Sequence, residues 1–370
     1  MPPVMSLNDV APDTGTAPTG WQPGALRPRL VRWTLILLGS IAVIITLANS
    51  SSDVSGTRIA RPADAPVVEH REFLGISNWY MYFQLLALVG FVAMWSIGIY
   101  KSVKRRKPTA MLIILATITA VSVWDPIINW AGYTAYDPRF FHFNIDWFYL
   151  RVEPSVQAWV AVIAYAGFFL LPAWFVLALY KRLARRAPGG SFITRRPRLT
   201  LLMMALPICI IFDGLAEASM VRAGLYTFTQ LMPIGVISAG QPWQFPLLWE
   251  PLTFGTFIGI TAPLMWENDQ RQSWGEAFAA RFKVFNGRPH IGAFVCSFAA
   301  FTIVYFGVWF SVWGFFRVTG MATSLVRTWD IPETSVYDPQ GFYQTAGNPG
   351  PFYKGWHPGV EKDLRPSGGG

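Results

Sequence analysis

The sequence has few charged residues and few cysteines, and each shortage excludes classes of protein. Asp, Glu, Lys and Arg make up 14% of the 370 residues, against about 25% in a typical soluble domain, while apolar residues make up 52%. This composition excludes a disordered protein and an ordinary soluble enzyme. The two cysteines, Cys209 and Cys296, each lie inside an apolar run, so we interpret them as core residues. They provide neither a disulfide framework nor a cysteine metal site.

Histidine is scarce as well. The four histidines fall in predicted loops or in the C-terminal tail: His70, His142, His290 and His357. Haem proteins and membrane di-iron oxygenases usually need several histidines on helices, so both classes are disfavoured. No lysine lies within an apolar run, which disfavours a retinal Schiff base. We therefore expect a site without a metal ion or a cofactor.

What the chain has instead is a series of long apolar runs. Each has about the 20 residues that a membrane-spanning helix needs. Seven runs are found, at about residues 30–49, 79–100, 109–130, 155–180, 199–220, 247–266 and 291–316. They predict an all-α fold, a polytopic membrane bundle of seven transmembrane helices. Small residues at 47–52 leave a signal peptide as the alternative for the first run, and an uncleaved anchor is favoured.

The basic residues give the bundle a direction. Most of the 30 Lys and Arg residues lie in alternate connections, at 27–32, 101–107, 181–198 and 271–288, and few lie in the others. The positive-inside rule then predicts the N-terminus inside and the C-terminus outside, in the plasma (inner) membrane. Because the arginines lie in short loops rather than on one face, membrane topology explains the net charge of +9 better than nucleic-acid binding does.

Three regions follow from this pattern. Residues 1–29 are rich in Pro, Gly and Thr and predict a disordered cytoplasmic arm. Residues 30–316 form the predicted seven-helix membrane domain, and 317–370 an irregular extracytoplasmic tail. At about 270–286, aromatic residues recur at helical spacing among basic ones, which predicts an amphipathic helix on the inner surface: Trp274, Phe278, Phe282 and Phe285.

Acidic residues gather at one depth of the predicted membrane, at its outer side. Asp125 and Asn129 end the third run, and Asp213 and Glu217 end the fifth. A carboxylate at membrane depth costs several kcal/mol unless it faces a cavity or a partner, which makes each acid a candidate for function. The alternative for Asp125, which precedes Pro126, is simply the end of a helix.

Two more acids, Glu153 and Glu250, each precede a proline at the outer start of a run. Proline suits the first turn of a helix, and a carboxylate there faces the positive end of the helix dipole. For these two residues, capping and function remain equal alternatives.

The pair on the fifth run carries the chemical hypothesis. Asp213 and Glu217 are four residues apart, so they share one helix face. Two carboxyl groups held close together tend to share a proton, and such a pair suits general acid/base catalysis. Arg222 is the basic residue predicted beside them and a candidate partner.

A short repeat groups these acids. Ala131-Gly132-Tyr133 follows Asp125, and Ala223-Gly224-Leu225-Tyr226 follows Asp213, with a Glu-Pro further on in each case. The two hairpins are therefore a candidate internal duplication around one pseudo-symmetric cavity. The connections at 140–149 and 241–249 are aromatic, and predict either an interfacial belt or a lid over a lipophilic substrate.

At these residues the sequence resembles the AveC-like family of actinobacterial membrane proteins. The resemblance spans about residues 75–270 and rests on four segments: Trp124-Asp-Pro-x-x-Asn129, Glu153-Pro154, Asp213…Glu217…Gly224-x-Tyr226, and Gln241…Gln244-x-Pro246…Glu250-Pro251. It implies a multi-spanning protein. The family's namesake is the spirocyclase of avermectin biosynthesis, which is associated with spiroketal formation from a dihydroxy-ketone polyketide and with dehydration. The resemblance does not fix the substrate.

These observations lead to one functional prediction and two alternatives. We expect a cofactor-independent cyclase or dehydratase for a lipophilic polyketide, isoprenoid or sterol-like substrate. Asp213 and Glu217 would act as acid and base and Asp125 would stabilise positive charge. The predicted substrate-binding residues are Asn129, Glu153, Arg222, Tyr226, Gln241 and Glu250. The alternatives are a lipid or sterol binder or transporter, and an accessory subunit with partners in a membrane complex.

Overall fold

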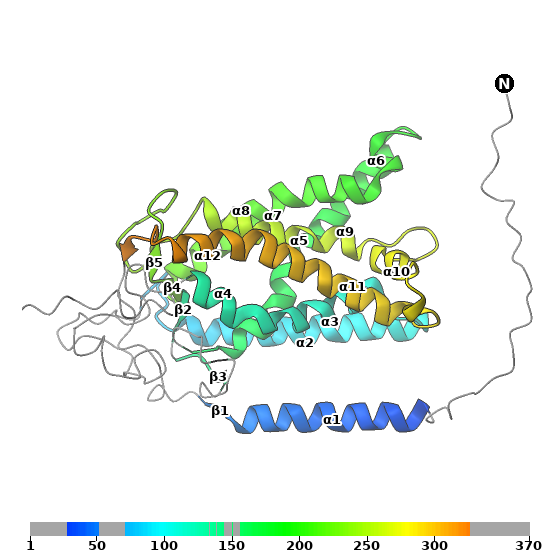
Figure 1. Cartoon of the computed structure of the whole chain (residues 1–370), viewed down its shortest axis with the longest axis horizontal. Coiled ribbons are helices and arrows are strands. Elements are labelled where there is room, and N and C mark those ends of the chain that lie inside the picture. Colours follow the sequence, from blue (N-terminus) through cyan, green and yellow to red (C-terminus); the bar gives the residue numbers. More distant parts are fainter. Residues whose placement is uncertain are drawn as a thin grey trace, which may run out of the picture. The chain divides into compact units, whose positions relative to one another are not determined.

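The computed structural model describes residues 28–51, 71–132, 134–137, 139–143, 150 and 156–325 (Figure 1). Helix α1 (Pro28–Ala48) forms a unit separate from the rest of the chain. The predicted arm at 1–29 falls outside the described residues except for its last two positions, as does the predicted tail after residue 325.

The second unit, from Asn49 onward, is mostly helical. Its main helices are α2 (Trp79–Arg105), α3 (Ala110–Val121), α4 (Asp125–Gly132), α5 (Trp159–Arg186), α7 (Pro197–Arg222), α8 (Trp249–Gly259), α9 (Thr261–Met265), α11 (Pro289–Val304) and α12 (Ser311–Val318). A 3-10 turn, η2 (Ser122–Trp124), joins α3 to α4, and a π-helical segment, η5 (Tyr305–Phe310), joins α11 to α12. Shorter helical pieces are α6 (Phe192–Arg195), α10 (Trp274–Ala279) and η4 (Lys283–Phe285).

All seven predicted runs are helical, and among the described residues five helices are long and apolar enough to cross a membrane: Trp79–Arg105, Ala110–Gly132, Trp159–Arg186, Pro197–Arg222 and Pro289–Arg317. The sixth run is divided into α8 and α9. Pro263 lacks the N–H that would bond the carbonyl of Gly259, and this accounts for the break at Ile260. The structure therefore shows a helical membrane protein, while the count of seven spans and their orientation stay predictions.

Short antiparallel strands close one end of the bundle. β2 (Thr134–Tyr136) pairs with β4 (Tyr226–Phe228), β1 (Ser50–Ser51) with β3 (His142–Phe143), and β5 (Gln230–Leu231) with β6 (Ser324–Leu325). Gln244 ties this end together, since its Nε2 donates to the carbonyl oxygens of Phe228 and Ser324. Strand β6 lies within the stretch predicted to be an irregular tail.

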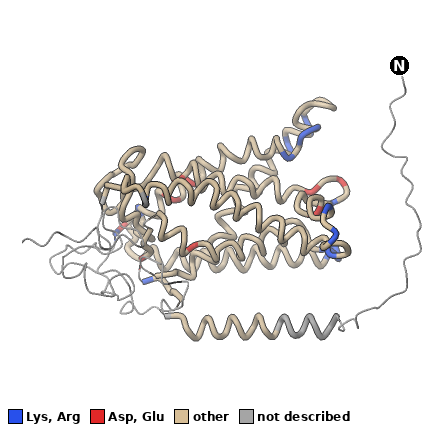
Figure 2. The backbone as a smooth tube through the Cα atoms, viewed as in Figure 1, with Lys and Arg blue, Asp and Glu red and all other residues tan. Residues whose placement is uncertain are grey.

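Basic residues gather at the opposite end, where α6 and α10 lie (Figure 2). Glu276 forms ion pairs there with Lys107 at 3.2 Å and with His290 at 2.9 Å. Burial raises the pKa of Glu276, but the hydrogen bond from the Ser273 backbone and the charges of Lys107 and His290 outweigh burial, so the pKa is lowered. The Glu276 carboxylate is thus held in its charged form.

The segment predicted as one amphipathic helix at 270–286 is instead broken. A capping box of Ser273 and Glu276 starts α10, which ends at Ala279 after six residues. The backbone is extended at Phe282 before η4 begins. The aromatic residues of the segment nevertheless line one apolar groove, because both pieces fold against α11.

Close packing of α7 on α8 depends on two glycines. A Cβ on Gly255 would lie 2.7 Å from the Cα of Ile210, and one on Gly259 would lie 3.1 Å from the side chain of Leu206. These glycines therefore have a packing role, since α7 leaves no room for a side chain at Gly255.

We predict that Gly255→Ala lowers the free energy of unfolding by about 1–3 kcal/mol, because the backbone of α7 must move to admit the methyl group. Gly90→Ala is the matched control in α2, since a Cβ there meets no atom within 4 Å. Thermal unfolding of the purified protein in detergent measures both. Equal stability of the two variants would contradict this packing.

Candidate functional site

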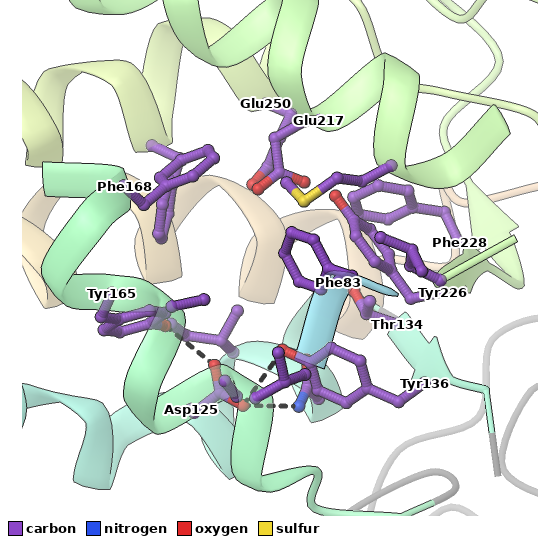
Figure 3. Close-up of a pocket in the computed structure, with 18 of the residues that line it drawn as sticks. Phe83, Asp125, Thr134, Tyr136, Tyr165, Phe168, Glu217, Tyr226, Phe228 and Glu250 are labelled. Atoms are coloured by element: carbon purple, nitrogen blue, oxygen red, sulfur yellow. Dashed lines mark hydrogen bonds between the residues drawn. The ribbon is translucent and has the colours of Figure 1, made fainter. Parts of the chain in front are cut away.

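A cavity lies among α2, α4, α5, α7, α8, the strands β2 and β4, and the π-helical segment (Figure 3). Its volume is about 80 Å³, which is room for several water molecules. Its walls are mostly aromatic and aliphatic, and three carboxyl groups face it: those of Asp125, Glu217 and Glu250. No Lys or Arg is among the described residues that line it.

Asp125 is fixed by four neutral donors. Tyr165 donates to its Oδ1 at 2.8 Å, and Gln157 donates to its Oδ2 at 2.8 Å. Asn129, one turn further along α4, and Tyr136 on β2 also donate to Oδ2, at 3.1 and 3.4 Å. These four hydrogen bonds hold the Asp125 carboxyl group in one orientation at the cavity wall.

Glu250 and Glu217 have far fewer partners. Trp309 donates its Nε1 hydrogen to both oxygens of Glu250, at 3.3 and 3.2 Å. Glu217 has no hydrogen bond with any residue that the structure describes. The two carboxyl groups interact electrostatically with each other and lie together in Figure 3, on the side of the cavity opposite Asp125. They are therefore the groups free to exchange a proton with a ligand.

The structure places the remaining predicted residues as follows. Tyr226 lines the cavity, and its hydroxyl is buried without a hydrogen-bond partner in the described part of the chain. Asp213 is fully buried and does not line the cavity, although it interacts electrostatically with Glu217 and Glu250. Glu153 lies outside the described residues.

Two predicted residues point elsewhere. Arg222 is exposed, and its guanidinium stacks on Trp243 at 4.3 Å instead of pairing with an acid of α7. Gln241 is exposed and away from the cavity, while Gln244 is the buried glutamine of that loop.

The guanidinium of Arg71 donates a hydrogen bond to the hydroxyl of Thr227. Burial and the nearby Arg222 lower the pKa of Arg71 to about 10, so it stays charged at neutral pH.

Sequence reasoning missed four of the five residues that donate hydrogen bonds to Asp125 and Glu250: Tyr136, Gln157, Tyr165 and Trp309. Tyr165 lies inside an apolar run, and Trp309 is one of 17 tryptophans, so neither stands out by its position. Gln157 gives the only signal, as an amide directly before a membrane helix. The aromatic connection at 140–149 contributes Phe140 to the cavity wall, but its residues 144–149 lie outside the described part.

The repeat noticed in the sequence has a structural counterpart. In the β2–β4 ladder, Thr134 pairs with Phe228 and Tyr136 with Tyr226, around a central pair of Ala135 and Thr227. Residues at matching positions of the two repeats thus exchange places across a local two-fold axis. Four such matched pairs line the cavity: Asp125 and Glu217, Ile128 and Met220, Thr134 and Tyr226, and Tyr136 and Phe228.

This register corrects one detail of the predicted repeat. The counterpart of Asp125 is Glu217, not Asp213, because Asp125 and Glu217 lie the same number of residues before their paired strands. Asp213 falls one helical turn earlier, behind the cavity wall. Each repeat therefore supplies one carboxyl group to a shared cavity, and Glu250 adds a third.

These features define a helical membrane protein with a buried, carboxylate-lined apolar cavity. The family to which it belongs follows from a comparison of sequences: a family model described as "Spirocyclase AveC-like" matches residues 104–337, so the chain belongs to the AveC-like spirocyclase family. This confirms the resemblance. The match runs further toward the C-terminus than expected and includes η5, which carries Trp309. No curated protein and no solved structure gives a significant match.

We predict that Trp309→Phe destabilises the fold by about 1.5–3 kcal/mol, because it leaves the buried carboxyl group of Glu250 without its hydrogen-bond donor. Trp313→Phe is the matched control. Trp313 stacks on Trp309 and donates to Thr253, whose hydroxyl keeps its own bond to the Trp249 carbonyl. We expect a loss of about 1 kcal/mol for the control. Equal losses in thermal unfolding would contradict a special role for the Trp309–Glu250 contact.

Proposed function

We propose that this protein is a membrane-embedded, cofactor-independent cyclase that closes rings on a lipophilic hydroxy-ketone by carboxylic acid/base catalysis. The observation that supports it best is the cavity itself: three carboxyl groups face one apolar space that no described Lys or Arg residue lines. Membership of a spirocyclase family supports the same reaction class. The proposal includes the predicted seven spans, with the N-terminus inside, in the plasma membrane.

The reaction needs proton transfers and no redox step. A substrate hydroxyl oxygen attacks the ketone carbon, its proton goes to a carboxylate, and the carbonyl oxygen takes a proton from an acid to give a hemiketal. The hemiketal hydroxyl is then protonated and leaves as water. A second hydroxyl attacks the resulting oxocarbenium ion and gives up its proton. The balance is one substrate to one spiroketal and one water.

The geometry suggests a role for each group. Glu217 and Glu250, which have few or no hydrogen bonds, would be the acid and base, in place of the predicted pair Asp213 and Glu217. Asp125, fixed by its donors, would stabilise positive charge on the far side of the cavity. The aromatic faces around it favour a cationic intermediate as well. Tyr226 and Asn129 would orient substrate hydroxyls.

The volume of the cavity also determines how a large substrate would have to bind. Its free space fits several waters but not a polyketide, and ligand pockets for such molecules are typically ~300–1,000 Å³. Binding would therefore displace flexible walls such as Met220 and Phe83. Because no cation lines the cavity among the described residues, a neutral or weakly cationic reacting group is favoured over an anionic one. The predicted isoprenoid and sterol-like substrates remain within this class.

We predict that Glu217→Gln and Glu250→Gln each lower turnover about 10²- to 10⁴-fold, as expected for loss of a general acid or base. The test is a null strain complemented with each variant, followed by mass spectrometry of its lipid extract. A compound heavier than the wild-type product by one water should accumulate. Asp269→Asn, which changes an exposed acid at the other end of the bundle, is the control and should restore the product.

Three outcomes of this experiment would contradict the proposal. If the Glu217 and Glu250 variants, shown to be folded, restore full product, the carboxyl groups are not catalytic. If the same unreacted compound only changes its distribution between cells and medium, the protein is a carrier. If the null strain loses no compound but a membrane complex falls apart, the protein is an accessory subunit.

A further inference from the structure

A second apolar space lies at the basic end of the bundle, far from the carboxylate cavity along the helices. It is a groove of about 460 Å³ between α9, α10, η4 and α11. Its described lining has no charged residue: Leu264, Trp274, Gly275, Phe278, Phe282, Phe285, Val295, Cys296, Ala299, Ala300 and Ile303. A volume of this size accommodates a lipid chain or a drug-sized molecule.

The groove is built by tight packing at one edge and small side chains in its floor. A Cβ on Gly292 would lie 2.5 Å from that of Ala279, and one on Gly275 would lie 3.0 Å from the carbonyl oxygen of Ala293. These glycines bring α10 against the first turns of α11. Further along α11, Ala299 and Ala300 leave the space open under the aromatic side chains.

Two arginines flank the groove without an anionic partner. The guanidinium of Arg198 lies 5.6 Å from the ring of Trp274 and 5.7 Å from that of Trp266, and its Nε is buried without a hydrogen bond. The guanidinium of Arg281 lies 5.6 Å from the ring of Phe278. Neither forms an ion pair with a described residue, whereas Arg105 and Lys107 at the same end pair with glutamates: Glu267 and Glu276.

The positions of these cations match one ligand. Trp274 and Phe278 are four residues apart on α10, so the two rings beside which these arginines lie are about one helical turn apart. We propose that the groove binds an anionic phospholipid, with one acyl chain in the apolar floor and the phosphate bound by Arg198 and Arg281. In the predicted orientation, the basic loops around it face the cytoplasmic surface, where anionic lipids are concentrated.

The test uses delipidated protein in detergent and native mass spectrometry. Phosphatidylglycerol and phosphatidylcholine with the same acyl chains are titrated in parallel. We expect one tight site for phosphatidylglycerol, and an affinity about 30-fold lower in the double variant Arg198→Gln plus Arg281→Gln, at roughly 1 kcal/mol for each arginine. Arg186→Gln, a change of an exposed arginine at the same end on α5, should leave binding unchanged.

Two further arms separate head group from chain. Ala299→Trp, which fills the floor of the groove, should abolish tight binding while the melting temperature shows that the fold is kept. Short-chain phosphatidylglycerol and inorganic phosphate should compete poorly. Equal affinity for the two lipids, unchanged binding in the double variant, or a second copy of the chain on the groove in place of lipid would overturn the proposal.

Discussion

The antiparallel pairing of β2 with β4 is the constraint on which the site depends. Each strand follows directly from a membrane helix that carries a carboxyl group, α4 or α7. The register of three residue pairs fixes how the two helices face each other, because a slip of one residue would turn every side chain of a strand to its other face. Asp125 and Glu217 reach the same cavity from opposite repeats as a consequence, together with Tyr136 and Tyr226 from the strands themselves.

The electrostatics of the cavity argue against a purely structural role for its carboxyl groups. Burying a carboxyl group in an apolar setting is costly unless it is paired, and pairing with Lys or Arg is the usual solution. Here the described side-chain donors to these groups are neutral: four to Asp125 and one to Glu250. Asp213 and Glu217 have none, as far as the described residues extend. A fold does not retain such groups for stability, so proton transfer or the binding of a positive charge is the economical explanation.

Much of the fold and of the candidate site could be predicted from the sequence, because the length of the apolar runs and the position of the acids along them determine both. The apolar runs became helices, and the acids predicted to lie at one depth largely share a cavity. The predictions that failed concerned which side chains of a helix or loop point into the cavity. Asp213 and Glu217 lie on one helix face, but only Glu217 reaches the cavity, because Gly214 and its neighbours pack against Pro251 on α8. Arg222 instead stacks on Trp243, and Gln241 is exposed while Gln244 takes the buried position of that loop.

The measurement that tests the central claim most directly is a cross-link between the two repeats. Ala135 and Thr227 form the central pair of the β2–β4 ladder, and paired residues in antiparallel strands lie within the Cα separation of a disulfide. The double variant Ala135→Cys plus Thr227→Cys should therefore form an intramolecular disulfide under mild oxidation in native membranes, and pairs that combine either cysteine with one at Ala110 on α3 should not. A failure to cross-link in a folded protein would contradict the pairing, and with it the shared cavity of Asp125 and Glu217.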